Sequence, residues 1–268
     1  MSAREFRFTI DGDDLRAVDA LAAHTGLPKG RIKDALNKGA VWLRSGSREQ
    51  RLRRATKALK RGEQLALYYD EALLQLEPLT ADLIADEKSY SVWYKPAGML
   101  AQGTRFGDHC ALLRVTEKYF TPARECFLIH RLDREAEGLM LIAHTRKAAE
   151  AFSALWQQRT IAKTYAVTVE GLAGAVGERR RIEEPLDDKT SITEFTVVDI
   201  DSEHNRSRLS VDLITGRKHQ IRRHMAGAGL PVVGDYRYGR GGEKLALRAV
   251  ALQFRCPLSG VDKNFRLD

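Results

Sequence analysis

Apolar side chains recur every three or four positions between residues 15 and 38, and this spacing predicts two helices. The first helix ends at the break that begins with Gly26, and the second covers residues 29–38. The apolar side of the first helix is formed by Leu15, Val18, Leu21 and Ala22. Short apolar runs at 41–43 and 65–69 predict strands. Together these elements predict a small independent domain over residues 13–70.

A second set of elements follows residues 71–87, whose scattered acids and Pro78 predict a linker. Alternating or continuous apolar runs predict strands at 91–94, 163–171, 192–200 and 208–213. Helical spacing predicts helices over 111–120 and 146–158, the second of them capped by Thr145. This mixture predicts an α+β domain over residues 88–258.

One stretch of the larger domain combines a buried strand with a charged loop. The residues from Phe127 to His144 read FLIHRLDREAEGLMLIAH, in which Gly138 opens an apolar run typical of a core strand. Asp133 therefore lies on a loop with a buried strand on each side, an arrangement that can hold a reactive group in place. The alternative is a structural carboxylate that caps a turn or pairs with Arg131 or Arg134.

The string H-R-L-D, followed by G-L-x-L-x-A, resembles the signature of the RluA-type RNA pseudouridine synthases. This resemblance implies that Asp133 is the catalytic carboxylate. The sequence departs from the usual pattern at Ala136 and Glu137, where the family has Thr and Ser. These two positions support the loop in our interpretation, so the departure concerns loop geometry more than the reaction.

Two further strings extend the resemblance. Lys163 to Gly171 is similar to the family's K-x-Y strand, which implies that Tyr165 stacks on the uracil and helps to remove its C5 proton. Residues 215–239 resemble the strings GRxHQIRxH and GxPxxGDxxYG, with departures at Lys218 and Leu230. The match implies that Arg222 pairs with Asp133 and keeps it ionised and oriented.

The string at 215–225 also predicts local structure. We expect Thr215 and Gly216 to open a helix, with one face formed by Lys218, Ile221, Arg222 and Met225. His219 and His224 are five positions apart, which does not suit a metal pair on one helix face, so we interpret both as structural.

The charge of the chain is concentrated near its start. Residues 13–61 contain 13 Lys and Arg against five Asp and Glu, which accounts for the whole formal net charge of +8. The order of elements over 13–70 resembles the ribosomal alpha-L RNA-binding motif, so a polyanionic partner is expected at this end. The predicted RNA contacts in this domain are Lys29, Arg31, Lys33, Arg51 and Arg54.

The resemblance implies a complete function. Its fold would be a mixed, mostly antiparallel sheet with flanking helices and a central cleft, plus the small α/β RNA-binding domain. Its reaction converts a uridine of ribosomal or transfer RNA, in a structured stem-loop, to pseudouridine without a metal or cofactor. In the larger domain His130, Arg131 and Arg217 would contact RNA, with Arg131 filling the space left by the flipped base.

Composition is consistent with this function. The three cysteines form no CxxC pair, and no apolar segment resembles a membrane span or signal peptide, so we expect a cytoplasmic protein. We also expect a monomer. Two alternatives stay open. One is a non-catalytic RNA-binding protein of the same fold. The other is a carboxylate-dependent sugar hydrolase, which would need a second acid; Asp235 is predicted instead to cap a turn.

Overall fold

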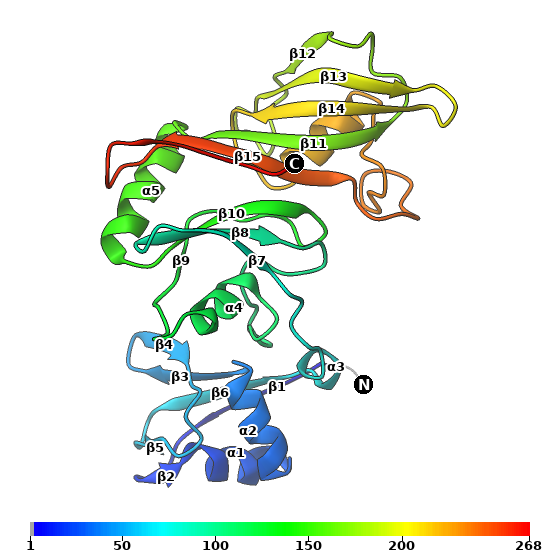
Figure 1. Ribbon diagram of the computed structural model, residues 1–268. Helices are drawn as coiled ribbons and strands as arrows, with labels where there is room; N and C mark the ends of the chain where they lie inside the picture. Colours follow the sequence, from blue (N-terminus) through cyan, green and yellow to red (C-terminus); the bar gives the residue numbers. More distant parts are fainter. Residues whose placement is uncertain (1–2) are drawn as a thin grey trace. The chain divides into compact units, whose positions relative to one another are not determined.

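A computed structural model describes residues 3–268, which form two compact units (Figure 1). Unit 1 runs to Leu79 and also contains Gln102–Ala123. Unit 2 consists of Thr80–Ala101 and Arg124–Asp268. Among the described residues no helix is long and apolar enough to cross a bilayer.

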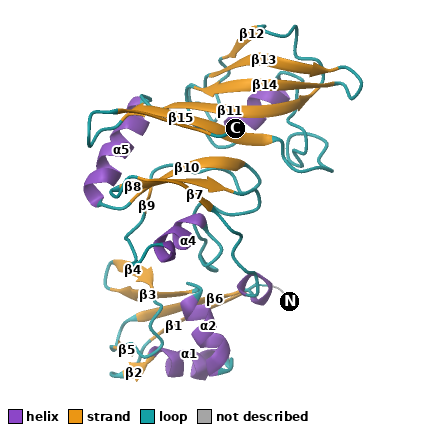
Figure 2. Cartoon of the chain, in the orientation of Figure 1, coloured by secondary structure: helices purple, strands orange, loops and turns teal. Residues whose placement is uncertain are grey.

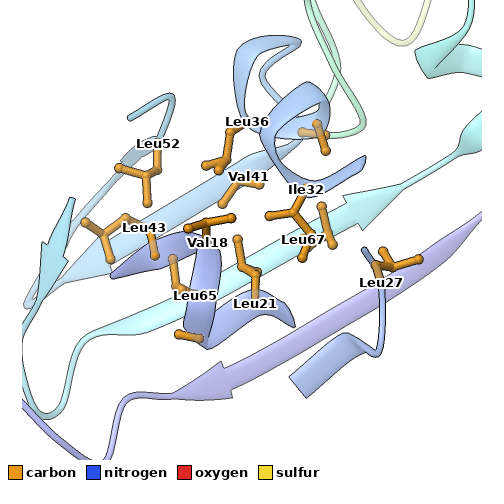
Figure 3. Packing of buried hydrophobic residues seen from close by; sticks show 14 of the residues in the cluster. Val18, Leu21, Leu27, Ile32, Leu36, Val41, Leu43, Leu52, Leu65 and Leu67 are labelled. Carbon is orange, nitrogen blue, oxygen red and sulfur yellow. The ribbon is translucent and has the colours of Figure 1, made fainter. Parts of the chain in front are cut away.

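Unit 1 is a four-stranded antiparallel sheet, ordered β1-β6-β3-β4, with helices packed against it. Its elements are β1 (Arg4–Thr9), β2 (Leu15–Arg16), α1 (Ala17–Thr25), α2 (Lys29–Asn37), β3 (Val41–Ser45), β4 (Arg48–Arg51), β5 (Ala58–Leu59), β6 (Gln64–Tyr69), α3 (Glu71–Leu74) and α4 (Leu112–Tyr119). Apolar side chains of α1 and α2 pack against those of β3 and β6, as Figure 3 shows for Val18, Leu21, Ile32, Leu36, Val41, Leu43, Leu65 and Leu67. Each fully buried side chain of this kind stabilises the fold by about 1.5–3 kcal/mol.

The limits of unit 1 differ from the predicted domain of residues 13–70. Strand β1 lies before residue 13 and pairs along its whole length with β6. Leu15 belongs to β2, so α1 begins only at Ala17. The first part of the segment predicted as a linker continues unit 1 to Leu79 and contains α3, which Asp70 caps by accepting a hydrogen bond from the Leu73 N–H. The rest of that segment belongs to unit 2.

Unit 2 is built on one sheet that contains ten strands within the described chain. Its elements are β7 (Asp82–Asp86), β8 (Tyr90–Lys95), β9 (Phe127–Leu128), β10 (Glu137–Ala143), α5 (Arg146–Gln158), β11 (Ala162–Glu170), β12 (Arg179–Ile182), β13 (Thr193–Asp201), β14 (Arg206–Leu213), α6 (Gln220–Gly227), β15 (Leu247–Arg255) and β16 (Asp262–Arg266). The main path is β12-β13-β14-β11-β15-β10-β8-β7, and Figure 2 shows these strands in orange.

Most neighbouring strands of this sheet are antiparallel, and β10 and β15 are paired in parallel. The prediction of an α+β fold with a mixed, mostly antiparallel sheet is confirmed. Strand β16 pairs with β15, so unit 2 continues past the predicted end at residue 258. The helix α5 was predicted to the residue, and its cap Thr145 accepts a hydrogen bond from the Ala148 N–H at 3.1 Å.

Gly138 marks the point where β10 meets β15. Its φ is +118°, and a Cβ atom there would lie 2.2 Å from the backbone oxygen of Ala249. Only glycine fits such a close approach of two backbones. Strand β10, which follows the Asp133 loop, therefore pairs with the central strand β15 at its first residues.

Helix α6 begins later than the sequence predicts. Gly216 and Arg217 lie in a loop, Lys218 and His219 form a turn, and His219 precedes the helix with a left-handed φ of 54°. Lys218 therefore lies outside the helix and is exposed, whereas Ile221, Arg222 and Met225 are buried on it. His219, just before the helix, and Arg222, within it, therefore both reach Asp133.

Candidate active site

A cavity of about 340 Å³ in unit 2 contains the three residues predicted to carry the chemistry. Asp133 enters it from the loop before β10, Tyr165 from β11, and Arg222 from α6. Its walls also contain His130, Arg131, Trp156, Lys163, Arg217 and His219. Residues that are 89 positions apart in the chain, such as Asp133 and Arg222, are thus brought together.

Arg222 is held between two aspartates. Its side chain is 1% exposed, and one guanidinium nitrogen donates to Asp133 Oδ2 at 3.2 Å. The Nε and the other terminal nitrogen donate to the two oxygens of Asp235 at 2.7 and 2.8 Å. Burial alone would lower the pKa of Arg222, but Asp235 and Asp133 raise it instead. The predicted contact between Arg222 and Asp133 is present, and a fixed positive charge faces the Asp133 carboxylate.

Asp235 does more than cap a turn. It accepts hydrogen bonds from the backbone N–H groups of Arg237 and Tyr238, as a capping residue would. Its bidentate pairing with Arg222, in a fully buried position, was not expected. Burial alone would raise the pKa of Asp235, but Arg222 and the two N–H groups lower it below its ordinary value. Asp235 therefore fixes the orientation of Arg222.

His219 lies at the site and not in the purely structural position that we predicted for it. Its Nε2 is 3.6 Å from Asp133 Oδ1, and its Nδ1 is 3.0 Å from the Tyr238 hydroxyl. Burial lowers the pKa of His219, against the opposing charge of Asp133. His224, in contrast, is buried between the Thr193 hydroxyl and the Glu184 carbonyl oxygen, which agrees with a structural role.

Tyr165 is 8% exposed and lines the cavity. Burial, followed by the charge of Asp133, raises the pKa of its phenol. The phenol is therefore protonated at neutral pH, which favours ring packing over a role as an anionic base.

His130 connects the start of the Asp133 loop to β10 and α5. Its Nε2 accepts a hydrogen bond from the Leu141 N–H at 3.0 Å, and its ring stacks on Trp156 with 4.1 Å between centroids. Burial, with a smaller contribution from Lys163, lowers its pKa to about 3. A neutral, buried ring with one nitrogen already bonded is poorly suited to the RNA contact that we predicted, so His130 is better described as a positioning residue.

Lys95 is a supporting residue that the sequence interpretation missed. It is fully buried, and its ammonium donates to the carbonyl oxygens of Ala136, Met99, Pro96 and Arg134 at 2.6, 2.9, 3.0 and 3.4 Å. Two of these oxygens belong to the loop immediately after Asp133. The available signal in the sequence is a lysine that directly precedes the turn at Pro96.

Comparisons with known proteins agree with this geometry. The sequence profile of the family described as RNA pseudouridylate synthase matches residues 89–227. The chain belongs to this family. It is therefore an RNA pseudouridine synthase, an isomerase, and the predicted family is confirmed.

Relatives and solved structures extend the comparison. The chain is 27% identical to an uncharacterised RNA pseudouridine synthase of Aquifex aeolicus, over 93% of this chain and 84% of that one. It is also 27% identical to the ribosomal large subunit pseudouridine synthase D of Vibrio parahaemolyticus, over 76% and 73%. Human RNA pseudouridylate synthase domain containing 1 has a TM-score of 0.60 at 20% identity, covering 72% of this chain and 86% of that structure, which shows a common fold.

The predicted RNA-contact residues of this synthase occupy two kinds of position. Arg131 is exposed beside Asp133, and Arg217 lines the cavity while donating to the Thr190 carbonyl oxygen. In unit 1 four predicted contacts are exposed, namely Lys29, Arg31, Lys33 and Arg54. Arg51 is different, because its guanidinium lies over the Trp42 ring, donates to the Thr104 carbonyl oxygen and contacts Asp108. Its structural contacts make Arg51 a poor candidate for gripping RNA.

Replacing Lys95 by Met should change how stability depends on pH. Burial lowers the pKa of Lys95 to about 8, from an ordinary value of 10.5. Between these values the unfolded chain binds a proton that the folded chain has lost, so this group makes stability rise with pH. The difference in unfolding free energy, wild type minus Lys95→Met, should therefore increase between pH 8 and 10 in urea titrations. A difference that falls over this range would contradict the buried position of the ammonium.

Proposed function

We propose that this synthase isomerises a uridine of large-subunit ribosomal RNA, with Asp133 as its catalytic carboxylate. The observation that carries the proposal is the cavity that Asp133, held by Arg222, lines together with Tyr165. The name of the Vibrio relative supports ribosomal RNA as the substrate. We also propose that the enzyme works in the cytoplasm and as a monomer.

The residues suit the cleavage of the glycosidic bond and the turning of the base. The N1–C1′ bond of uridine breaks, the base turns over, a C5–C1′ bond forms, N1 gains a proton and C5 loses one, so the atoms balance without oxidation or reduction. The Asp133 carboxylate would attack C1′ or stabilise positive charge on the sugar. The hydrogen bond from Arg222 holds that carboxylate in one orientation, at no cost in reorganisation during the reaction. Tyr165 would stack on the uracil while it turns.

Incubation of the protein with RNA tests this proposal directly. Unmodified large-subunit ribosomal RNA and transfer RNA are incubated separately, and pseudouridine and free uracil are measured by mass spectrometry. Pseudouridine in the ribosomal RNA supports the proposal. Pseudouridine in transfer RNA alone would show that transfer RNA, and not ribosomal RNA, is the substrate. Free uracil would indicate a hydrolase, and RNA binding without product would indicate the non-catalytic alternative. A pseudouridine map of cells with and without the gene identifies the position.

We further propose that unit 1 grips RNA phosphates through the exposed cations of α2 and the loop after β4. Replacing Lys29, Arg31, Lys33 and Arg54 by Ala should reduce the log–log salt slope of RNA binding by about 3, at roughly 0.7 for each contact with a single strand. Affinity is measured by fluorescence anisotropy between 50 and 300 mM salt. A matched control replaces four exposed lysines and arginines of unit 2, namely Arg146, Lys147, Arg179 and Arg255. An unchanged slope in the unit 1 variant would refute this proposal.

A further inference from the structure

Lys163 is a buried cation without a protein anion. It is 6% exposed, and its side chain lines the same cavity as Asp133 and Tyr165. Within residues 3–268 no acidic side chain forms an ion pair with it, and no oxygen accepts a hydrogen bond from its ammonium. Its one polar contact is with the face of the Trp156 ring, 4.9 Å from the centroid. Buried charges are normally paired, because a lone charge loses its hydration without compensation.

The charge that acts most on Lys163 is a positive one, and the Asp133 carboxylate of the same cavity is paired with Arg222 instead. His130 stacks on the same Trp156 ring, and its imidazole is neutral. Arg159, a second cation, is the C-cap residue of α5. Burial and the charge of Arg159 both lower the pKa of Lys163. An ammonium at the wall of a cavity with no anionic partner loses part of its hydration in the free protein, and it is stabilised when an anion enters the cavity.

An anion bound by Lys163 would lie at some distance from the uracil that stacks on Tyr165. Lys163 and Tyr165 alternate with exposed or half-buried neighbours on β11, so both side chains project from one face of the strand. Two residues along a strand span about 7 Å. A uracil that stacks on Tyr165 next to Asp133 therefore leaves Lys163 beside the neighbouring part of the RNA chain, whose charged group is a phosphate.

We infer that Lys163, together with Trp156, forms a subsite for the backbone phosphate adjacent to the target uridine. This inference rests on the proposed function, since it needs the uridine to occupy the cavity. The substrate then supplies the counter-charge that the protein lacks, and binding places C1′ of the sugar relative to Asp133. Charge-assisted hydrogen bonds from a buried ammonium to phosphate belong to the stronger class of polar contacts.

The test combines a change in the protein with a change in the RNA. An oligoribonucleotide that contains the uridine mapped above is synthesised with a phosphate or a neutral methylphosphonate at the linkage on either side. The nucleotide 5′ to each altered linkage carries 2′-O-methyl in the compared RNAs, so that its hydroxyl cannot cleave the linkage, and an all-phosphate RNA without 2′-O-methyl serves for the activity measurement. Dissociation constants and single-turnover rate constants are measured for wild type, Lys163→Met, Lys163→Arg and the exposed-surface control Lys147→Met.

With the all-phosphate RNA, Lys163→Met should weaken binding by about tenfold, the lower range for loss of one charged hydrogen bond. With the methylphosphonate at one of the two linkages, the same substitution should weaken binding by less than about twofold. Lys163→Arg should restore most of the dependence on that phosphate, and Lys147→Met should behave as wild type. If the Met variant does not fold, Lys163→Gln takes its place in the same comparison.

Three outcomes would overturn the inference. Equal losses with every RNA would show a structural role for Lys163. A rate constant that falls tenfold with an unchanged dissociation constant would place Lys163 at the leaving uracil. Wild-type RNA affinity in both Lys163→Met and Lys163→Arg would show that Lys163 has no role in binding RNA. In each case pseudouridine formed by the wild-type protein on the all-phosphate RNA without 2′-O-methyl shows whether the proposed function still stands, so the two failures are distinguishable.

Discussion

Asp133→Asn should lower the single-turnover rate of pseudouridine formation by about 10⁴, which corresponds to roughly 5.4 kcal/mol of barrier. The substitution is close to isosteric, and it removes the negative charge that either attacks C1′ or stabilises a cationic sugar. RNA affinity should change little or increase slightly, because the Asp133 carboxylate repels phosphates. The measurement is product formed by excess enzyme, together with the dissociation constant of the same RNA.

The control for this prediction is Glu150→Gln, the same loss of charge at an exposed position on α5. It should retain wild-type rates, and the melting temperature of Asp133→Asn should stay near that of wild type or rise. Appreciable product from a folded Asp133→Asn protein would mean that another group performs the chemistry. The Arg222 network would then have to be explained as purely structural.

Arg222→Met should cost both stability and catalysis. It leaves Asp235 buried and charged without its partner, and breaking a buried pair in this way costs about 3–5 kcal/mol. It also removes the donor that orients Asp133, for which a rate loss of about 10²–10³ is expected, as for other fixed donors in active sites. Arg222→Lys keeps one charge but cannot reach both aspartates with a planar fork, so a smaller rate loss is expected.

A double variant separates the two effects. Arg222→Met combined with Asp235→Asn removes both buried charges, and the amide oxygen still accepts from the Arg237 and Tyr238 N–H groups. Most of the lost unfolding free energy should return, while the rate should stay low because Asp133 still lacks its donor. Denaturant unfolding and single-turnover kinetics measure the two quantities. Recovery of the rate together with stability would show that Arg222 acts only through the fold.

The local part of this structure was predictable because it depends on neighbouring residues. Periodicities of two and of three to four positions identified β10, β11, α2 and α5 with small errors at their ends, since side-chain direction repeats with these periods. The loop carrying Asp133 was placed between two strands by the same means. The start of α6 was misplaced, because a left-handed His219 is a rare conformation that the sequence does not announce.

The arrangement of the site depended on the tertiary structure. Asp133, His219, Arg222 and Asp235 meet only because α6 packs beside the sheet in one register. Lys95 reaches the Asp133 loop because β8 pairs with β10 from Gly138 onwards. The approach of His219 and Asp235 to the Asp133–Arg222 pair has no local signature, and the one local signal for the Lys95 contact is a lysine directly before a turn. The return of Gln102–Ala123 to unit 1 was also unpredicted, since its residues resemble an ordinary loop and helix.

The sequence by itself therefore determined the elements, the fold class and the family, through patterns that short stretches carry alone. The resemblance also implied the pairing of Arg222 with Asp133. Only the tertiary structure decided that Arg222 pairs with Asp235 as well, that Lys95 contacts four carbonyl oxygens, and that Lys163 has no anionic partner among the described residues. The physical reason is that the energy of a charged group depends on its burial and on the partners within a few ångströms. Both of these quantities are set by distant parts of the chain.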